Sequence, residues 1–152
     1  MNLLKGISIA TLLIVALIGC KDIKDCQLKD DTSFFVIALF DRDTTSSTES
    51  IAFTSIIEES LNGAFYLDTT MSVFGLPVNT TDTTTTYFFQ SELGADTLVV
   101  SYDFQYNIFF EDCEPVQSFF DLSVLSHTFD SLVIVNENLN NEIIRNVEIY
   151  LD

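Results

Sequence analysis

The chain has few basic residues and few glycines, and each shortage narrows the functions that it can have. Only 6 Lys and Arg stand against 23 Asp and Glu, which gives a formal net charge of −17 over 152 residues. A surface this acidic argues against nucleic acid as a partner and against docking to an anionic membrane surface. The 5 Gly include no G-x-x-x-x-G-K pattern, so the sequence offers no phosphate-binding loop of that kind.

Histidine and cysteine are also scarce, and this weighs against catalysis. His127 is the only His, and having Ser126 beside it does not make a catalytic triad, because triad partners meet in space at hydrogen-bond distance. Carboxylates are plentiful, but none shows a spacing that a known acid–base mechanism requires. A zinc site would need more His or Cys than the 1 His and 3 Cys present.

Calcium is the one metal worth weighing, because oxygen ligands occur in two short segments. These are residues 41–43 (Asp-Arg-Asp) and 136–138 (Asn-Glu-Asn). The spacing does not match an EF-hand loop, and the first segment contains an Arg, so solvated turns are the simpler interpretation. We therefore predict no metal site, no cofactor and no enzymatic activity.

Residues 1–19 have the three parts of a secretory signal, which we expect to be helical. Lys5 supplies the positive start, and the apolar run from Gly6 to Leu17 is shorter than the roughly 20 residues that a membrane-spanning helix needs. The run ends in Leu-Ile-Gly-Cys, which fits the pattern at which lipoproteins are cut and lipidated. We predict that Cys20 becomes the first mature residue and carries the lipid. The alternative is an ordinary signal peptide with an incidental Cys.

Residues 20–32 are polar and charged, and they indicate a tether. With Cys20 lipidated, Cys26 and Cys113 remain as an even pair, which we expect to form a disulfide in an oxidising compartment. The closed loop of 87 positions (113 minus 26) is worth about 4–5 kcal/mol on the chain-entropy model. The charged residues after Cys20 also loosely resemble the signals that send lipoproteins of Bacteroidota to the outer face of the outer membrane. A solvated linker is the alternative.

Residues 33–152 are predicted to form one all-β domain. Hydrophobic residues make up 47% of the chain, with 14 Phe and 5 Tyr, so a packed core is expected. Short runs rich in β-branched and aromatic residues alternate with turn-like stretches, which favours an antiparallel β-sandwich, immunoglobulin-like, of about eight strands. The only stretch with helical character, 54–61, is assigned to a strand. The predicted strands are Phe34–Phe40, Ile51–Glu58, Ala64–Leu67, Thr85–Gln90, Thr97–Asp112, Val116–Leu125, Phe129–Val135 and Ile143–Leu151.

The clearest alternation runs through the predicted strand Thr97–Asp112. Its apolar side chains fall on one parity and most of its polar side chains on the other, a period of two. We expect a bulge or bend near residues 105–107, because the strand is long. The residues on the apolar parity are Leu98, Val100, Tyr102, Phe104, Tyr106, Ile108 and Phe110.

Phe-Phe pairs predict a second aromatic surface. Neighbouring residues in a strand face opposite sides, so one ring of each pair should enter the core while the other points outward. The outer rings are either covered by loops or edges, or they form an exposed patch for a partner or a glycan. The pairs are 34-35, 88-89, 109-110 and 119-120.

Asp followed by Thr or Ser, and then by Thr or Leu, occurs five times. The pattern resembles the O-glycosylation site of exported proteins in Bacteroidota, and composition alone would give about one match. Asp is also common in turns because its side chain caps and turns the backbone, so the alternative is that these residues only mark turns. The two Thr- and Ser-rich loops, 43–50 and 79–86, hold the best candidates, Thr44 and Thr83. The candidate acceptor residues are Thr44, Thr69, Thr83, Thr97 and Ser131.

Taken together, these motifs resemble an uncharacterised family of small Bacteroidota lipoproteins. The resemblance rests on the lipidation motif, Cys26, the segments 40–43, 74–78, 87–89 and 96–102, Cys113 and the closing segment 145–150. The chain departs from the family pattern where Glu114-Pro115 follows Cys113 in place of Gly, and where Arg145-Asn146 replaces a His. The resemblance implies a cell-envelope location and no established activity, so it assigns no functional residues.

We therefore predict a cell-envelope lipoprotein that is anchored by its lipid to the outer membrane, on its surface-exposed or its periplasmic face. It would act as a non-enzymatic binding or assembly module for an envelope protein or a glycan. The alternatives are a purely structural envelope lipoprotein and an envelope hydrolase.

Overall fold

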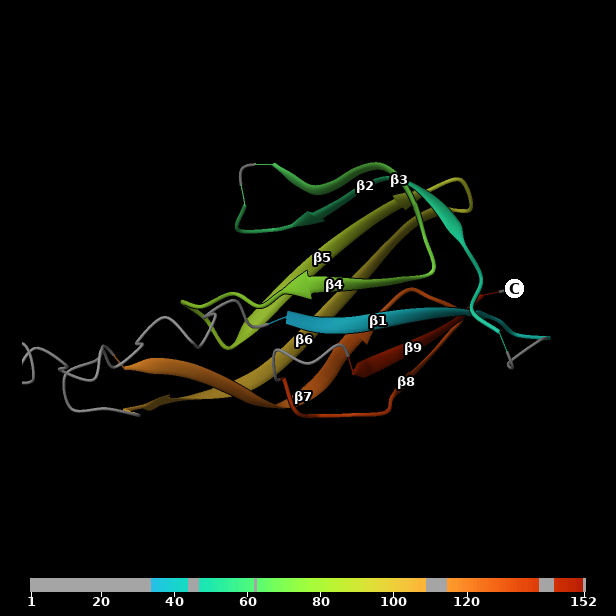
Figure 1. The fold of residues 1–152 in the computed structure, drawn as a ribbon. Helices are drawn as coiled ribbons and strands as arrows, with labels where there is room; N and C mark the ends of the chain where they lie inside the picture. Colours follow the sequence, from blue (N-terminus) through green and yellow to red (C-terminus); the bar gives the residue numbers. More distant parts are fainter. Residues whose placement is uncertain (1–33, 44–46, 62, 109–114, 140–143, 152) are drawn as a thin grey trace, which may run out of the picture.

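The computed structural model describes residues 34–43, 47–61, 63–108, 115–139 and 144–151. These residues form nine strands and contain no helix (Figure 1). Accordingly, none of the described segments offers an apolar helix of membrane-spanning length. The strands are β1 (Phe34–Asp41), β2 (Ile51–Glu58), β3 (Ala64–Met71), β4 (Val73–Pro77), β5 (Thr84–Ser91), β6 (Gly94–Asn107), β7 (Val116–His127), β8 (Ser131–Ile134) and β9 (Arg145–Leu151).

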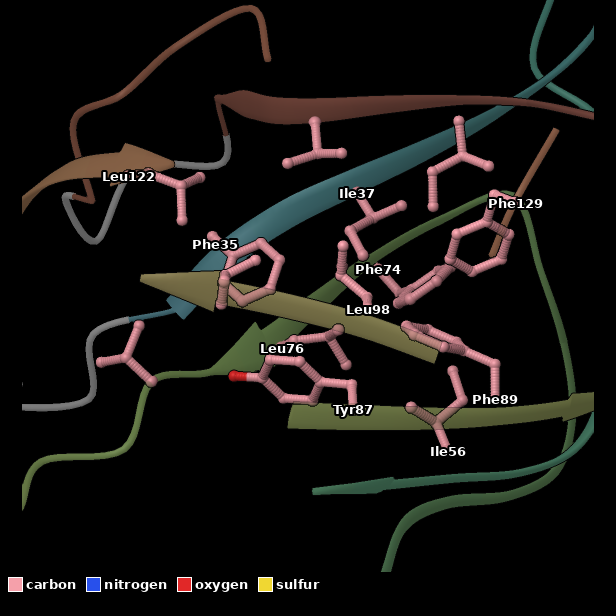
Figure 2. Packing of buried hydrophobic residues seen from close by; sticks show 14 of the residues in the cluster. Phe35, Ile37, Ile56, Phe74, Leu76, Tyr87, Phe89, Leu98, Leu122 and Phe129 are labelled. Atoms are coloured by element: carbon pink, nitrogen blue, oxygen red, sulfur yellow. The ribbon is translucent and has the colours of Figure 1, made fainter. Parts of the chain in front are cut away.

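The strands form two sheets, which confirms the predicted all-β sandwich. One sheet has four strands in the order β4-β1-β9-β8, and the other has five in the order β3-β2-β5-β6-β7. Neighbouring strands are antiparallel except β1 and β9, which run parallel. The core lies between the sheets, where aromatic side chains from both meet; Phe35 of β1, for example, packs edge-on against Tyr87 of β5 at 5.4 Å between ring centroids (Figure 2).

The period of two places the core residues as predicted along the first half of β6. Leu98, Val100 and Tyr102 are buried. Farther along the same parity, Phe104 is only partly buried and Tyr106 is exposed, because β6 continues beyond the core. The expected irregularity near residues 105–107 is wrong, since the register shifts lie nearer the middle of the strand pair, where β7 contains extra residues.

The Phe-Phe pairs behave as predicted wherever the structure describes them. Phe35, Phe89 and Phe119 lie in the core, whereas their neighbours in the chain point away from it. Phe88 is exposed, and the ring of Phe34 packs over Gly75 on the adjacent strand. The pair 109-110 lies outside the described residues.

One strand, β4, is absent from the predicted set, because Gly75 and Pro77 are residue types that usually end a strand. Both residues suit the position that β4 occupies. β4 is an edge strand, where a proline costs no ladder bond on its outer side. A Cβ at Gly75 would lie 2.9 Å from Cδ2 of Phe34, so glycine leaves room for the aromatic ring.

A bulge in β9 is stabilised by the buried side chain of Asn146. Val36 of β1 is opposite Arg145 and Ile37 is opposite Val147, so Asn146 is the extra residue. Its Oδ1 accepts a hydrogen bond from the Val36 N–H at 2.9 Å. Its Nδ2 donates to the carbonyls of residues 136 and 138, at 3.0 and 2.8 Å. One side chain thus replaces a missing ladder bond and holds the loop that follows β8.

Asn146→Ala should lower the free energy of unfolding by about 3 kcal/mol, because it leaves one buried donor and two carbonyls without their partner. Denaturant unfolding measures this value. Asn107→Ala is the matched control, since Asn107 is less buried and makes one side-chain bond, to Ser118 at 2.9 Å. Equal losses in the two variants would contradict the role given to Asn146.

Candidate interaction surface

The free edge of β4 is covered by tyrosines from the opposite sheet. The carbonyl of Ser72, just before β4, accepts a hydrogen bond from Leu39 N at 2.9 Å. Every second carbonyl from Ser72 onward therefore points toward β1, and the carbonyls in between point away from β1. The outward carbonyls of residues 75, 77 and 79 each accept a hydrogen bond from a tyrosine hydroxyl. The donors are Tyr66 to Gly75 at 3.0 Å, Tyr87 to Pro77, and Tyr102 to Asn79 at 3.0 Å. Figure 2 shows the Tyr87 hydroxyl directed toward the end of β4.

Tyr102 also binds the segment that crosses from β4 to β5. Its hydroxyl accepts from Asn79 N at 2.7 Å and lies 2.6 Å from the hydroxyl of Thr85. Burial raises the pKa of Tyr87 and of Tyr102 above the ordinary value, and it raises the pKa of Tyr66 in the same direction. These hydroxyls therefore stay protonated, and able to donate, across the physiological pH range.

Among the other three edges, β3 is the most open. The edge of β7 is partly covered, because Leu122 N donates to Glu137 O at 3.0 Å and Phe119 bridges Leu139. β8 is only four residues long. β3 has eight residues, and no described strand pairs with its outer side. The edge is irregular in two places, because Phe65 is an extra residue relative to β2 and Asp68 has a φ of 45°.

The outer face of the five-stranded sheet carries a band of apolar side chains that starts at this open edge. Leu67 of β3 is 64% exposed, and Phe88 of β5 is 43% exposed opposite Ile57 of β2. The band continues to β6 and β7, where Leu125 is the extra residue of a bulge and is exposed. We call this band the outer apolar band; its members are Phe65, Leu67, Ile57, Phe88, Val99 and Leu125.

In the centre of the outer apolar band, around Phe88 and Val99, the polar neighbours carry hydroxyl groups and no charge. Thr97 lies opposite Phe88, and Thr86 lies opposite Val99. Ser101 and Ser123 share a hydrogen bond at 2.7 Å. Charged residues lie at the margins of the band, at Asp68 beside Leu67 in β3, at Asp103 of β6 and at Asp121 of β7. In a chain of net charge −17, the centre of this face can therefore be desolvated without burying a carboxylate.

The predicted site residues fall in several separate places. Thr83 is exposed in the loop before β5, with its N–H bound to Asp82 Oδ1 at 2.7 Å. Thr69 donates its hydroxyl to the Leu67 carbonyl at 2.7 Å, while Thr97 and Ser131 are partly buried within strands. Four of the predicted site residues lie outside the described residues, as do the predicted signal (1–19) and tether (20–32): Cys20, Cys26, Thr44 and Cys113.

The segments considered for catalysis or calcium are engaged in local hydrogen bonds. His127 lies at the end of β7 with Nδ1 3.1 Å from the Phe129 carbonyl. Asp41 Oδ1 accepts from Asp43 N at 2.6 Å. The carbonyls of Asn136 and Asn138 accept from Asn146, as described above. Across the described ranges, no group of three or more His, Cys, Asp or Glu is arranged to hold a metal ion.

Sequence reasoning did not find the tyrosine contacts or the outer apolar band as a unit. The sequence identifies each tyrosine as an apolar strand residue, but its acceptor lies in β4 or just after it, which only the packing of the two sheets brings close. Phe88 was identified through its Phe-Phe pair, whereas Leu67 and Leu125 had no sequence signal, because their exposure depends on strand register.

Residues 36–151 match a family described as a family of unknown function (DUF6452). The chain belongs to this family. The match extends through nearly the whole described domain, from β1 to β9, and it confirms the expected membership of an uncharacterised family. No match is found among curated proteins or among solved structures. The lipid anchor and the bacterial group stay predictions for this DUF6452 member.

The buried tyrosines predict a loss of stability at high pH. Their pKa is raised in the folded state above the unfolded value of about 10, so their contribution is complete below pH 10 and is lost as pH rises beyond it. Tyrosinate absorbance should therefore rise together with loss of the β-sheet circular dichroism signal. Tyr87→Phe should flatten this dependence and cost about 1–2 kcal/mol at neutral pH, because the Pro77 carbonyl loses its donor. In the control Tyr106→Phe, on an exposed residue, stability at neutral pH should be unchanged.

Proposed function

We propose that this DUF6452 member is an exported lipoprotein of the bacterial cell envelope that binds another envelope protein. Three features support the export and the anchor. Leu17-Ile18-Gly19-Cys20 fits a lipidation motif, a charged stretch follows it, and the motifs of the chain resemble those of small lipoproteins of Bacteroidota. Diacylglycerol and an added N-acyl chain on Cys20 would give stable attachment to the outer membrane.

The observation that carries the binding role is the outer apolar band. Large exposed apolar side chains gathered on one sheet face around an uncharged centre, beside an open strand edge, are the arrangement that protein partners cover. A protein partner fits this face better than a glycan, because the rings of Phe65 and Phe88 lie among the aliphatic side chains of Ile57 and Leu67. The band does not require a catalytic group, and a non-enzymatic binding or assembly module is the function that it supports best.

The anchor is tested by Cys20→Ser in the full-length protein. This variant should move from the membrane fraction to the soluble fraction, because it lacks the sulfur to which the lipid is attached. Cys26→Ser is the matched control and should stay with the membranes. Membrane association of Cys20→Ser equal to that of the parent would refute the lipid anchor.

The binding face is tested by photo-crosslinking in the native cells. A photoreactive side chain at Leu67 should yield a discrete crosslinked protein, whereas the same side chain at Val135, an exposed residue after β8, should not. Phe88→Ser in the Leu67 background should remove the product, because it weakens the band without touching the crosslinking residue. A product that contains carbohydrate and no protein would point to a glycan, and identical results at positions 67 and 135 would count against the band.

A further inference from the structure

The carboxylates at the margins of the outer apolar band stand at its two ends. Asp68 follows Leu67 in β3, at one end of the band, and is exposed. At the other end, Asp103 of β6 is exposed and lies opposite Phe120 of β7, and Asp121 comes next in β7 and is also exposed. The band therefore has an uncharged centre, one carboxylate on the β3 side and two on the side of β6 and β7.

The two ends of the band are far apart. Leu67 is level with Gln90 near the end of β5, because both pair with the same residue of β2. Asp103 lies two residues beyond Ser101, which pairs with Thr84 at the start of β5. Eight residues along the strands (six within β5 and two within β6) and three strand spacings separate the ends, which is about 30 Å on the diagonal. A partner that meets both ends presents a surface of that length, comparable with the diameter of a small domain.

The part of the chain that the structure describes offers these carboxylates no cation on the same sheet. Arg42 and Arg145 are the only Lys or Arg among the described residues. Arg145 belongs to β9 and forms a salt bridge with Glu148 at 3.0 Å. Arg42 follows β1, and its N–H donates to the Leu151 carbonyl at 3.0 Å. Both belong with the four-stranded sheet, so the charge that matches the ends of the band comes from outside the described residues.

The charge of the whole chain acts in the same direction as these local carboxylates. At a net charge of −17, the chain repels an acidic surface and attracts a basic one before contact is made. The centre of the band asks for something different, because Phe88 and Val99 have Thr97 and Thr86 as their partners across the strands and no charged residue. The band therefore specifies an order of chemistry on its partner, which is basic, then apolar, then basic.

We propose that the protein bound by the outer apolar band carries an apolar centre with Lys or Arg at both ends. These basic side chains pair with Asp68 at one end and with Asp103 and Asp121 at the other. The pattern rests on the proposed binding role and adds the charge of the partner to it. Apolar burial supplies most of the affinity, while the charge pairs at the rim fix the orientation and raise the association rate. A second copy of this chain is disfavoured, because its own band carries carboxylates at the ends.

The salt dependence of crosslinking in isolated cell envelopes tests the charge pattern. The full-length lipoprotein carries the photoreactive side chain at Leu67, as in the test of the binding face. Raising NaCl from about 0.1 M to about 1 M shortens the Debye length from about 10 Å to about 3 Å. The yield of the crosslinked protein should fall several-fold, because exposed charge pairs are screened. Apolar cover alone would not be screened, and the yield would then stay the same.

Asp103→Asn combined with Asp121→Asn tests the pairs at one end directly. Both changes lie about 30 Å from the crosslinking residue, so they leave its photochemistry untouched. At low salt the product should fall several-fold, and the yield that remains should depend little on salt. Asp121 has a φ of 55°, which Asn also adopts, so the change preserves the backbone. The matched control, Asp43→Asn with Glu49→Gln, removes the same charge from two exposed residues between β1 and β2 and should leave the yield unchanged.

Mass-spectrometric sequencing of the crosslinked peptide provides an independent readout. The partner segment joined at position 67 should contain Lys or Arg, because Asp68 is the next residue. Chymotrypsin is the suitable protease, since trypsin would cut at the basic residues in question.

Two results would overturn the charge pattern. One is a Leu67 product whose yield is the same at both salt concentrations and in the Asp103→Asn, Asp121→Asn variant. The other is a product joined to residues 20–32 of the same chain, since its own Lys residues would then supply the matching charge. Loss of the protein product at Leu67 altogether would instead remove the binding face, and the charge pattern with it, so the two failures are distinguishable.

Discussion

Three tyrosine hydroxyls that hold the free edge of β4 are the contacts on which the architecture depends. β4 has the sequence Val-Phe-Gly-Leu-Pro, which is weak strand material on local grounds. One side of β4 is paired with β1. On its other side the carbonyls of Gly75 and Pro77 accept from Tyr66 and Tyr87, and the carbonyl of Asn79, just after β4, accepts from Tyr102. Because these tyrosines come from three strands of the other sheet, the same contacts join the two layers. The burial that allows each hydroxyl to reach its carbonyl also raises the pKa of the tyrosine, so edge protection and alkaline sensitivity have one cause.

A second polar contact stabilises the junction of the first and last strands, β1 and β9. One extra residue, Asn146, interrupts the parallel pairing of β1 and β9. Its side-chain oxygen accepts the hydrogen bond of the Val36 N–H, which has no ladder partner at this point. Its amide also holds the loop after β8, and that loop in turn covers part of the β7 edge through Glu137 and Leu139. With the β4 and β7 edges engaged and β8 short, β3 is left as the open edge, next to the outer apolar band.

Much of the fold could be predicted from the sequence because its signals are local. Alternation along residues 98–102 identifies the core face of β6, and the Phe-Phe pairs identify residues that face opposite sides. β4 could not be predicted, since Pro77 is compatible with a strand only at an edge, and edges are defined by tertiary pairing. The sequence pattern placed Asn146 among the polar residues on the outward side of the last strand. Its role in the core depends on the bulge opposite Val36, which only the strand pairing reveals. The outer apolar band likewise depends on which strands are neighbours, although Phe88 could be assigned to a second surface in advance.

The parallel pairing of β1 with β9 has a mechanical consequence. β1 lies between β4 and β9, with hydrogen bonds along both sides. A force applied through the chain before Phe34 acts along the strand axis, so it loads the rungs of both ladders together in shear. A terminal strand at the edge of a hairpin would instead be peeled away one rung at a time. With the proposed anchor before Phe34 and the proposed partner on the larger sheet, tension would load β1 in shear, the direction in which its two ladders resist separation.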